Sequence, residues 1–187
     1  RELGMRVVVH TGLVRRRELA QGLAAAGIDA AMLDIIGANE TIREVYHLDD
    51  TTVDDFERAL ALLSEAELRI IPHIVIGLHY ARLLGEDDAL AMIARYPVST
   101  LVLVVLTPLV GTAMEGLAPP PLEDVSAFFG RARAALPETK VRLFKISSLA
   151  RTHLNEGNRG QPHDELIREL WRICQRARDT GSLNDIQ

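Results

Sequence analysis

The sequence predicts an α/β fold, a partial (β/α) barrel of the TIM type with parallel strands. Short β-branched apolar runs alternate with longer amphipathic stretches, and five such strand-and-helix units follow one another. The clearest run, at residues 70–76, closes on Gly77, which is typical of a buried parallel strand ending at a site. A complete barrel takes about 250 residues, so a chain of 187 residues predicts part of one.

The first two units precede that strand. A strand is expected at residues 6–10, and the helix after it, at about 14–26, ends at Gly27, whose tolerance of positive φ suits a helix end. The second strand, 30–36, carries Asp34 inside an apolar run.

Later elements follow the same alternation. Thr51 or Thr52 is expected to cap a helix whose apolar face carries Phe56, Leu60 and Leu63. The other expected elements are a short helical insert at 39–46, a helix at about 87–95, a strand at 101–106, a helix at 122–136 ended by Pro137, and a strand at 140–146.

The barrel domain is expected to end near residue 146. Residues 147–187 are expected to form a polar linker followed by an amphipathic helix. Because the sequence begins at Arg1 and shows no targeting pattern, we expect a fragment whose first strands lie upstream.

Composition excludes several classes of function. A net charge of −5 without a basic stretch argues against nucleic-acid binding. No apolar run reaches the length of a membrane span. The single cysteine, Cys174, excludes a disulfide framework and favours a reducing compartment such as the cytoplasm.

Ligands of parallel α/β proteins bind at the carboxyl ends of the strands, so those ends supply the candidate residues. Asp34 is the most informative, because a carboxylate in an apolar strand costs several kcal/mol unless it is paired. Asp34 is expected to bond either to a hydroxyl or ammonium group of a ligand or to neighbouring backbone amides. His10 and His73 are either satisfied core residues or functional groups at one end of the barrel. A metal-binding histidine cluster is an alternative that the ligand spacing does not support, so no metal ligands are predicted.

Four segments resemble radical S-adenosylmethionine enzymes of the biotin synthase and lipoyl synthase type. The run His73-x-Val75-x-Gly77-x-x-Tyr80 falls where these enzymes have GxIxGxxE. Residues 32–34 with 44–46 look like their fourth-strand segment, 107–115 resembles the PxxGTP-type loop after the sixth strand, and 9–12 looks like the end of the third strand.

The resemblance implies a 4Fe-4S cluster that reduces S-adenosylmethionine, and a 5′-deoxyadenosyl radical that abstracts hydrogen. Sulfur insertion is the nearest implied reaction, and methylation and rearrangement are alternatives that use the same core. The resemblance also implies that Asp34 holds the methionine amine or a ribose hydroxyl, and that Val75 and Gly77 line the adenine. The implied cofactor-binding residues are Asp34, His73, Val75, Gly77, Gly111 and Thr112, and the implied substrate-side residues are His10, Thr11 and Lys145.

The sequence departs from that family at three places. His73 stands where the family has glycine, Tyr80 where it has an acid, and Phe56 where it has a basic residue that clamps the cofactor carboxylate. The cluster-binding CxxxCxxC segment is absent, and Cys174 matches no ligand. The chain as given is therefore expected to be inactive alone.

Expected partners are a small-molecule or carrier-protein-bound substrate, an electron donor and a second subunit. Two other classes stay open. One is a cluster-free barrel lyase or hydrolase that uses Asp34, His10, His73 and Lys145 for acid-base or Schiff-base chemistry. The other is a noncatalytic half-barrel that completes another chain.

Overall fold

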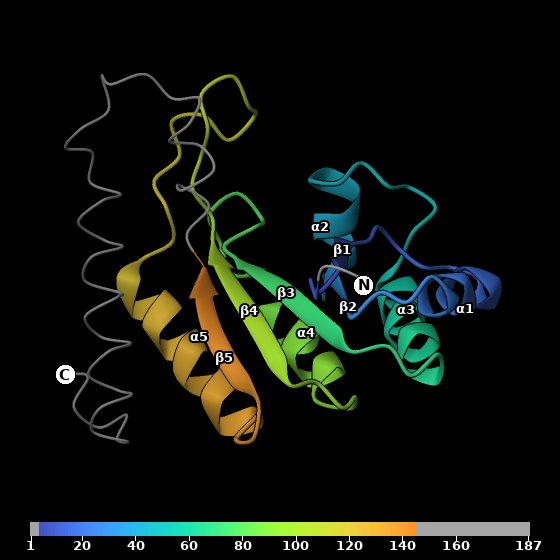
Figure 1. Ribbon diagram of the computed structural model, residues 1–187. Helices are drawn as coiled ribbons and strands as arrows, with labels where there is room; N and C mark the ends of the chain where they lie inside the picture. Colours follow the sequence, from blue (N-terminus) through green and yellow to red (C-terminus); the bar gives the residue numbers. More distant parts are fainter. Residues whose placement is uncertain (1–3, 145–187) are drawn as a thin grey trace.

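The computed structural model describes residues 4–144, which form one parallel sheet with helices packed against it (Figure 1). The strand order is β1-β2-β3-β4-β5, and each strand pairs in parallel with the next one along the chain. This confirms the α/β class with five parallel strands, as in part of a TIM-type barrel. The elements are β1 (Val8–His10), α1 (Arg17–Ala25), β2 (Ala30–Asp34), α2 (Asn39–Glu44), α3 (Val53–Glu65), β3 (Ile70–Ile76), α4 (Glu86–Ile93), β4 (Thr100–Val105), α5 (Leu122–Ala135) and β5 (Lys140–Phe144).

The two faces of the sheet differ, because successive side chains of a strand point to opposite sides. One set packs with the helices into the hydrophobic core, where Leu33, Ile74 and Leu103 meet Leu60 of α3 and Phe128 of α5. The other set lies outside this core and forms what we call the inner face. Over β1, β2 and β3 the inner face is lined by His10, Met32, Asp34, Ile71, His73 and Val75.

Several element boundaries differ from the prediction. The first strand begins at Val8 rather than Arg6. Helix α1 begins at Arg17 instead of Val14, because Val14 is buried in the core from an extended segment and Arg15 contacts Thr51. β2 ends at Asp34, although the Ile35 N–H still donates to the His73 carbonyl at 2.9 Å.

The helix ends follow the local sequence. Thr52, not Thr51, caps α3, and its N–H donates to the Asp55 carboxylate at 3.0 Å in a capping box. Gly27 has the positive φ predicted for the end of α1. Gly37 is needed for close packing, because a Cβ there would stand 2.1 Å from the Gly85 carbonyl oxygen.

Within residues 4–144, no helix is both long and apolar enough to cross a lipid bilayer. The predicted linker and terminal helix at 147–187, with Cys174, lie outside the described residues.

Two glycine substitutions test the packing. We expect Gly37→Ala to lower the free energy of unfolding by about 1–3 kcal/mol, since backbone atoms of Gly85 and Ala89 occupy the space of the new methyl group. Gly22→Ala, in the exposed interior of α1 with nothing within 4 Å, is expected to raise it by about 0.5–1 kcal/mol. Urea denaturation followed by circular dichroism measures both, and equal effects would contradict the packing described here.

Candidate functional site

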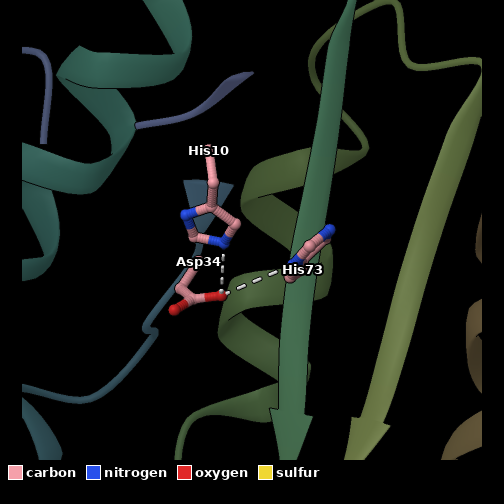
Figure 2. Close-up of side chains that lie close together, drawn as sticks. All are labelled: His10, Asp34 and His73. Carbon is pink, nitrogen blue, oxygen red and sulfur yellow. Dashed lines mark ion pairs between the residues drawn. The ribbon is translucent and has the colours of Figure 1, made fainter. Parts of the chain in front are cut away.

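Three polar side chains from three neighbouring strands meet on the inner face. His10 and Asp34 are the last residues of β1 and β2, and His73 lies in the middle of β3 (Figure 2). Asp34 stands directly opposite His73 in the β2–β3 register, and His10 stands opposite Met32, two residues before Asp34. The parallel pairing therefore brings together residues that are far apart in the sequence.

Both imidazoles approach the same carboxylate oxygen. His73 Nδ1 lies 3.6 Å and His10 Nε2 lies 3.8 Å from Asp34 Oδ1. The two rings are 5.3 Å apart between centroids in an edge-to-face arrangement. The side chain of His73 is 14% exposed, that of Asp34 33% and that of His10 48%, so the cluster runs from a buried side to an open side.

The surroundings of Asp34 keep its carboxylate charged. Burial alone would raise the pKa of Asp34, but His73, His10 and the Tyr46 hydroxyl together outweigh burial and hold this pKa below its ordinary value. Burial and the nearby Asp34 carboxylate raise the pKa of Tyr46, so its hydroxyl stays protonated and able to donate. The Asp34 carboxylate is thus favoured in its charged form on a partly buried surface.

The second carboxylate oxygen of Asp34 is held by Tyr46, which the sequence analysis did not single out. The Tyr46 hydroxyl donates to Asp34 Oδ2 at 3.3 Å from the segment that follows α2. α2 is itself anchored, because Asn39 Oδ1 accepts the Val53 N–H at 3.0 Å. The sequence signal was the position of this tyrosine, in a short insert directly after the strand that carries Asp34.

Val75 and Thr11 lie close to the cluster along the chain. Val75 is half-buried on the inner face, two residues beyond His73, and supplies an apolar surface beside the polar group. Thr11 follows His10, and both its N–H and its hydroxyl donate to the Met32 carbonyl, at 2.8 and 3.3 Å. In this structure the Thr11 hydroxyl ties β1 to β2.

Gly77 lies at the same end of the sheet as Asp34, as the resemblance requires, but its backbone is covered. A Cβ at Gly77 would meet the ring of Pro120 at 2.3 Å, and the Gly77 N–H donates to Glu86 Oε1 at 2.8 Å. The predicted open backbone is thus occupied by the chain's own Pro120 and Glu86. Gly77 also has φ of +78°, which gives a second structural reason for glycine there.

The remaining predicted residues do not join the cluster. Gly111 and Thr112 are exposed in the loop between β4 and α5, which extends beyond the carboxyl end of β4 (Figure 1). Their recorded hydrogen bonds are local, from Gly111 N–H to the Glu115 carboxylate and from the Thr112 hydroxyl to the Leu109 carbonyl. Lys145 lies outside the described residues.

Two further buried polar residues organise the loop after β3. His79 Nδ1 is 3.2 Å from the Thr41 hydroxyl, and His79 Nε2 is 3.7 Å from the Glu44 carboxylate, which fastens the loop to α2. Glu86 is 5% exposed, and burial raises the pKa of its carboxyl group. These contacts identify His79 as a residue that holds the loop in place.

The cluster of His10, Asp34 and His73 has three chemical uses. The charged carboxylate can accept hydrogen bonds from an ammonium or hydroxyl group of a ligand. The imidazoles beside it can exchange protons with a substrate. Within residues 4–144, these three residues also form the one recorded group whose ligand atoms, all within 4.8 Å of one another, could hold a metal ion.

Comparison with known proteins supports the fold. No family model matches the sequence, and no curated protein matches it either. Among solved structures, a radical SAM methyltransferase from Sphaerobacter thermophilus matches with a TM-score of 0.52 at 12% identity. A candidate phosphonomutase from Burkholderia cenocepacia J2315 matches with a TM-score of 0.53 at 14% identity. The matches cover 74% and 95% of this chain, but only 40% and 65% of those two proteins. At such identities both matches show a shared fold alone.

The electrostatics of Asp34 can be tested directly. In His73→Leu we expect the pKa of Asp34 to rise, because burial remains while a group that lowers this pKa is lost. In the native protein the folded-state pKa lies below the unfolded one, so Asp34 stabilises the fold above its unfolded pKa and loses this effect as the pH falls through the folded value. In the variant that loss is expected at a higher pH.

Carbon-detected NMR titration of the Asp34 carboxyl group measures this change. His47→Asn is the matched control, because His47 is exposed and is not among the groups of residues 4–144 that shift the pKa of Asp34. An unchanged Asp34 pKa in His73→Leu would show that His73 does not act on the carboxylate.

Proposed function

We propose that this chain is part of a radical S-adenosylmethionine enzyme and that its inner face binds S-adenosylmethionine beside Asp34. The observation that carries the proposal is a charged, one-third exposed carboxylate on the inner face, at the position where the resemblance expects the cofactor. The four sequence segments support the proposal, and so does the shared fold with a radical SAM methyltransferase.

The side chains on the inner face fit parts of this cofactor. Asp34 can accept a charge-assisted hydrogen bond from the methionine ammonium or a bond from a ribose hydroxyl. Val75 offers an apolar surface for the adenine. The backbone of Gly77 does not fit the expected adenine contact, because Pro120 and Glu86 already occupy it.

S-adenosylmethionine together with a 4Fe-4S cluster supplies a 5′-deoxyadenosyl radical in such enzymes. The described residues do not fit the cluster, since clusters of this kind are held by cysteine thiolates and the single cysteine, Cys174, lies outside them. The proposal therefore requires cluster ligands that are not in this sequence. The chain's own part is to bind and orient the cofactor and to place His10, the most exposed member of the cluster, toward a substrate.

Within the superfamily, the proposal favours a biotin synthase-like or lipoyl synthase-like enzyme, with a small-molecule or carrier-bound substrate and an external electron donor. The segments 9–12, 32–34 with 44–46, and 73–80 support this narrower assignment.

A binding experiment on the 187-residue chain tests the cofactor contact. Loss of one charged hydrogen bond costs about 1.5–3 kcal/mol, so Asp34→Asn is expected to weaken S-adenosylmethionine binding about 10- to 100-fold. Asp54→Asn, which makes the same charge change on the exposed side of α3, is expected to leave the affinity unchanged. Isothermal titration calorimetry measures the affinities, and equal affinities for native protein and Asp34→Asn would remove Asp34 from the site.

A cluster-free barrel lyase or hydrolase is the second candidate. It is favoured by the two histidines that meet one carboxylate, an arrangement suited to proton transfer, and by the shared fold with the candidate phosphonomutase. If Lys145 forms a Schiff base in this enzyme, borohydride treatment with substrate carbonyl compounds is expected to leave a stable mass increase on Lys145. A Lys145→Arg variant that gains the same mass would assign the adduct to another residue.

A further inference from the structure

The two imidazole nitrogens of the cluster approach one carboxylate oxygen at ion-pair distances, longer than a good hydrogen bond. Hydrogen bonds join donor and acceptor atoms at about 2.7–3.2 Å, whereas the two imidazole nitrogens stand 3.6 and 3.8 Å from Asp34 Oδ1. Figure 2 shows both rings directed at this single oxygen. A ligand placed between the three side chains could contact all three at shorter distances than they contact one another.

A metal ion has the size that these distances call for. Zinc binds imidazole nitrogen and carboxylate oxygen at about 2.0–2.2 Å, so ligand atoms around one ion stand roughly 3.0–3.5 Å apart. The two observed distances to Asp34 Oδ1 exceed that range by a few tenths of an ångström, and all three ligand atoms lie within 4.8 Å of one another. Binding an ion would require the three side chains to move closer together.

The backbone fixes the three ligands relative to one another. The Thr11 N–H donates to the Met32 carbonyl at 2.8 Å, and the Ile35 N–H donates to the His73 carbonyl at 2.9 Å, so the sheet hydrogen bonds continue past His10 and Asp34. The Tyr46 hydroxyl holds Asp34 Oδ2 and leaves Oδ1 directed at the imidazoles. Hydrogen bonds of this kind orient metal ligands and strengthen metal binding.

We propose that His10, Asp34 and His73 bind one divalent transition metal ion, of the Zn²⁺ or Fe²⁺ class. Two imidazoles with one carboxylate are a donor set that proteins use for catalytic zinc and for non-haem iron, and it leaves coordination positions free. Such an ion would be accessible from the side of His10, which is nearly half exposed, and could also take water or an oxygen or nitrogen atom of a small molecule.

This inference stands on the geometry of the two imidazoles around Asp34 Oδ1 and not on the cofactor proposal. The experiment below contains no S-adenosylmethionine, so its outcome stands apart from that proposal.

The test is a titration of the chelator-treated 187-residue chain with Zn²⁺ and, separately, with Co²⁺. We expect one ion per chain by calorimetry, and Co²⁺ absorption bands in the visible region that indicate nitrogen and oxygen ligands. Weak binding with no defined stoichiometry would overturn the proposal, since it would mean adventitious surface binding only.

Three variants locate the ion. His10→Gln, Asp34→Asn and His73→Gln are each expected to lower the affinity at least about tenfold, since even residues that only orient metal ligands have effects of about 10- to 100-fold. The control His47→Asn, at an exposed histidine outside the cluster, is expected to bind like the native chain. Circular dichroism reports folding, and His10, at the exposed end of β1, is the position least coupled to the core. Native-like affinity in a folded His10→Gln variant would overturn the assignment.

Discussion

The parallel register of β1, β2 and β3 is the constraint on which the whole site depends. Leu33 and Ile74 point into the core, and this fixes the adjacent residues Asp34 and His73 on the inner face. A slip of β2 by one residue would exchange the faces, bury the Asp34 carboxylate among aliphatic side chains and expose Leu33. Because that exchange would be costly, the hydrophobic core fixes the register. The core, rather than any contact within the site, therefore holds the three polar residues together.

Much of this arrangement could be predicted from the sequence. The apolar runs identified every strand of the described sheet, and the predicted candidates included all three members of the cluster, although His73 lies in the middle of β3 and not at its end. Their mutual contact could not be predicted, because residues 10, 34 and 73 lie on separate strands and only the pairing register aligns them. Tyr46 escaped attention for the same reason, since its hydroxyl reaches Asp34 from a segment whose path the local sequence does not define.

Gly77 shows where a local inference fails. The backbone at the end of β3 is not open to a ligand as predicted, because Pro120 packs against it from a loop more than forty residues later in the chain. A proline run such as 119–121 is typical of a stiff connection, but no local pattern shows where such a segment returns. The Gly77 N–H is also bound by Glu86, so the end of β3 is covered by the chain itself. The polar groups that remain accessible to a ligand are those of His10 and Asp34.

Both proposals for the inner face place a cation against the Asp34 carboxylate, which two imidazole nitrogens approach to 3.6 and 3.8 Å. Burial opposes the charge on Asp34, and polar neighbours maintain it. A cationic ligand would stabilise the charged carboxylate further, whereas an anion would repel it. An ammonium ligand carries its own hydrogens and can be held by the carboxylate alone. A metal ion instead needs lone pairs from Asp34 and both imidazoles together. The two imidazoles beside Asp34 are not needed to hold an ammonium, whereas a metal ion needs both of them. The histidines, rather than the aspartate, therefore discriminate between the two ligands.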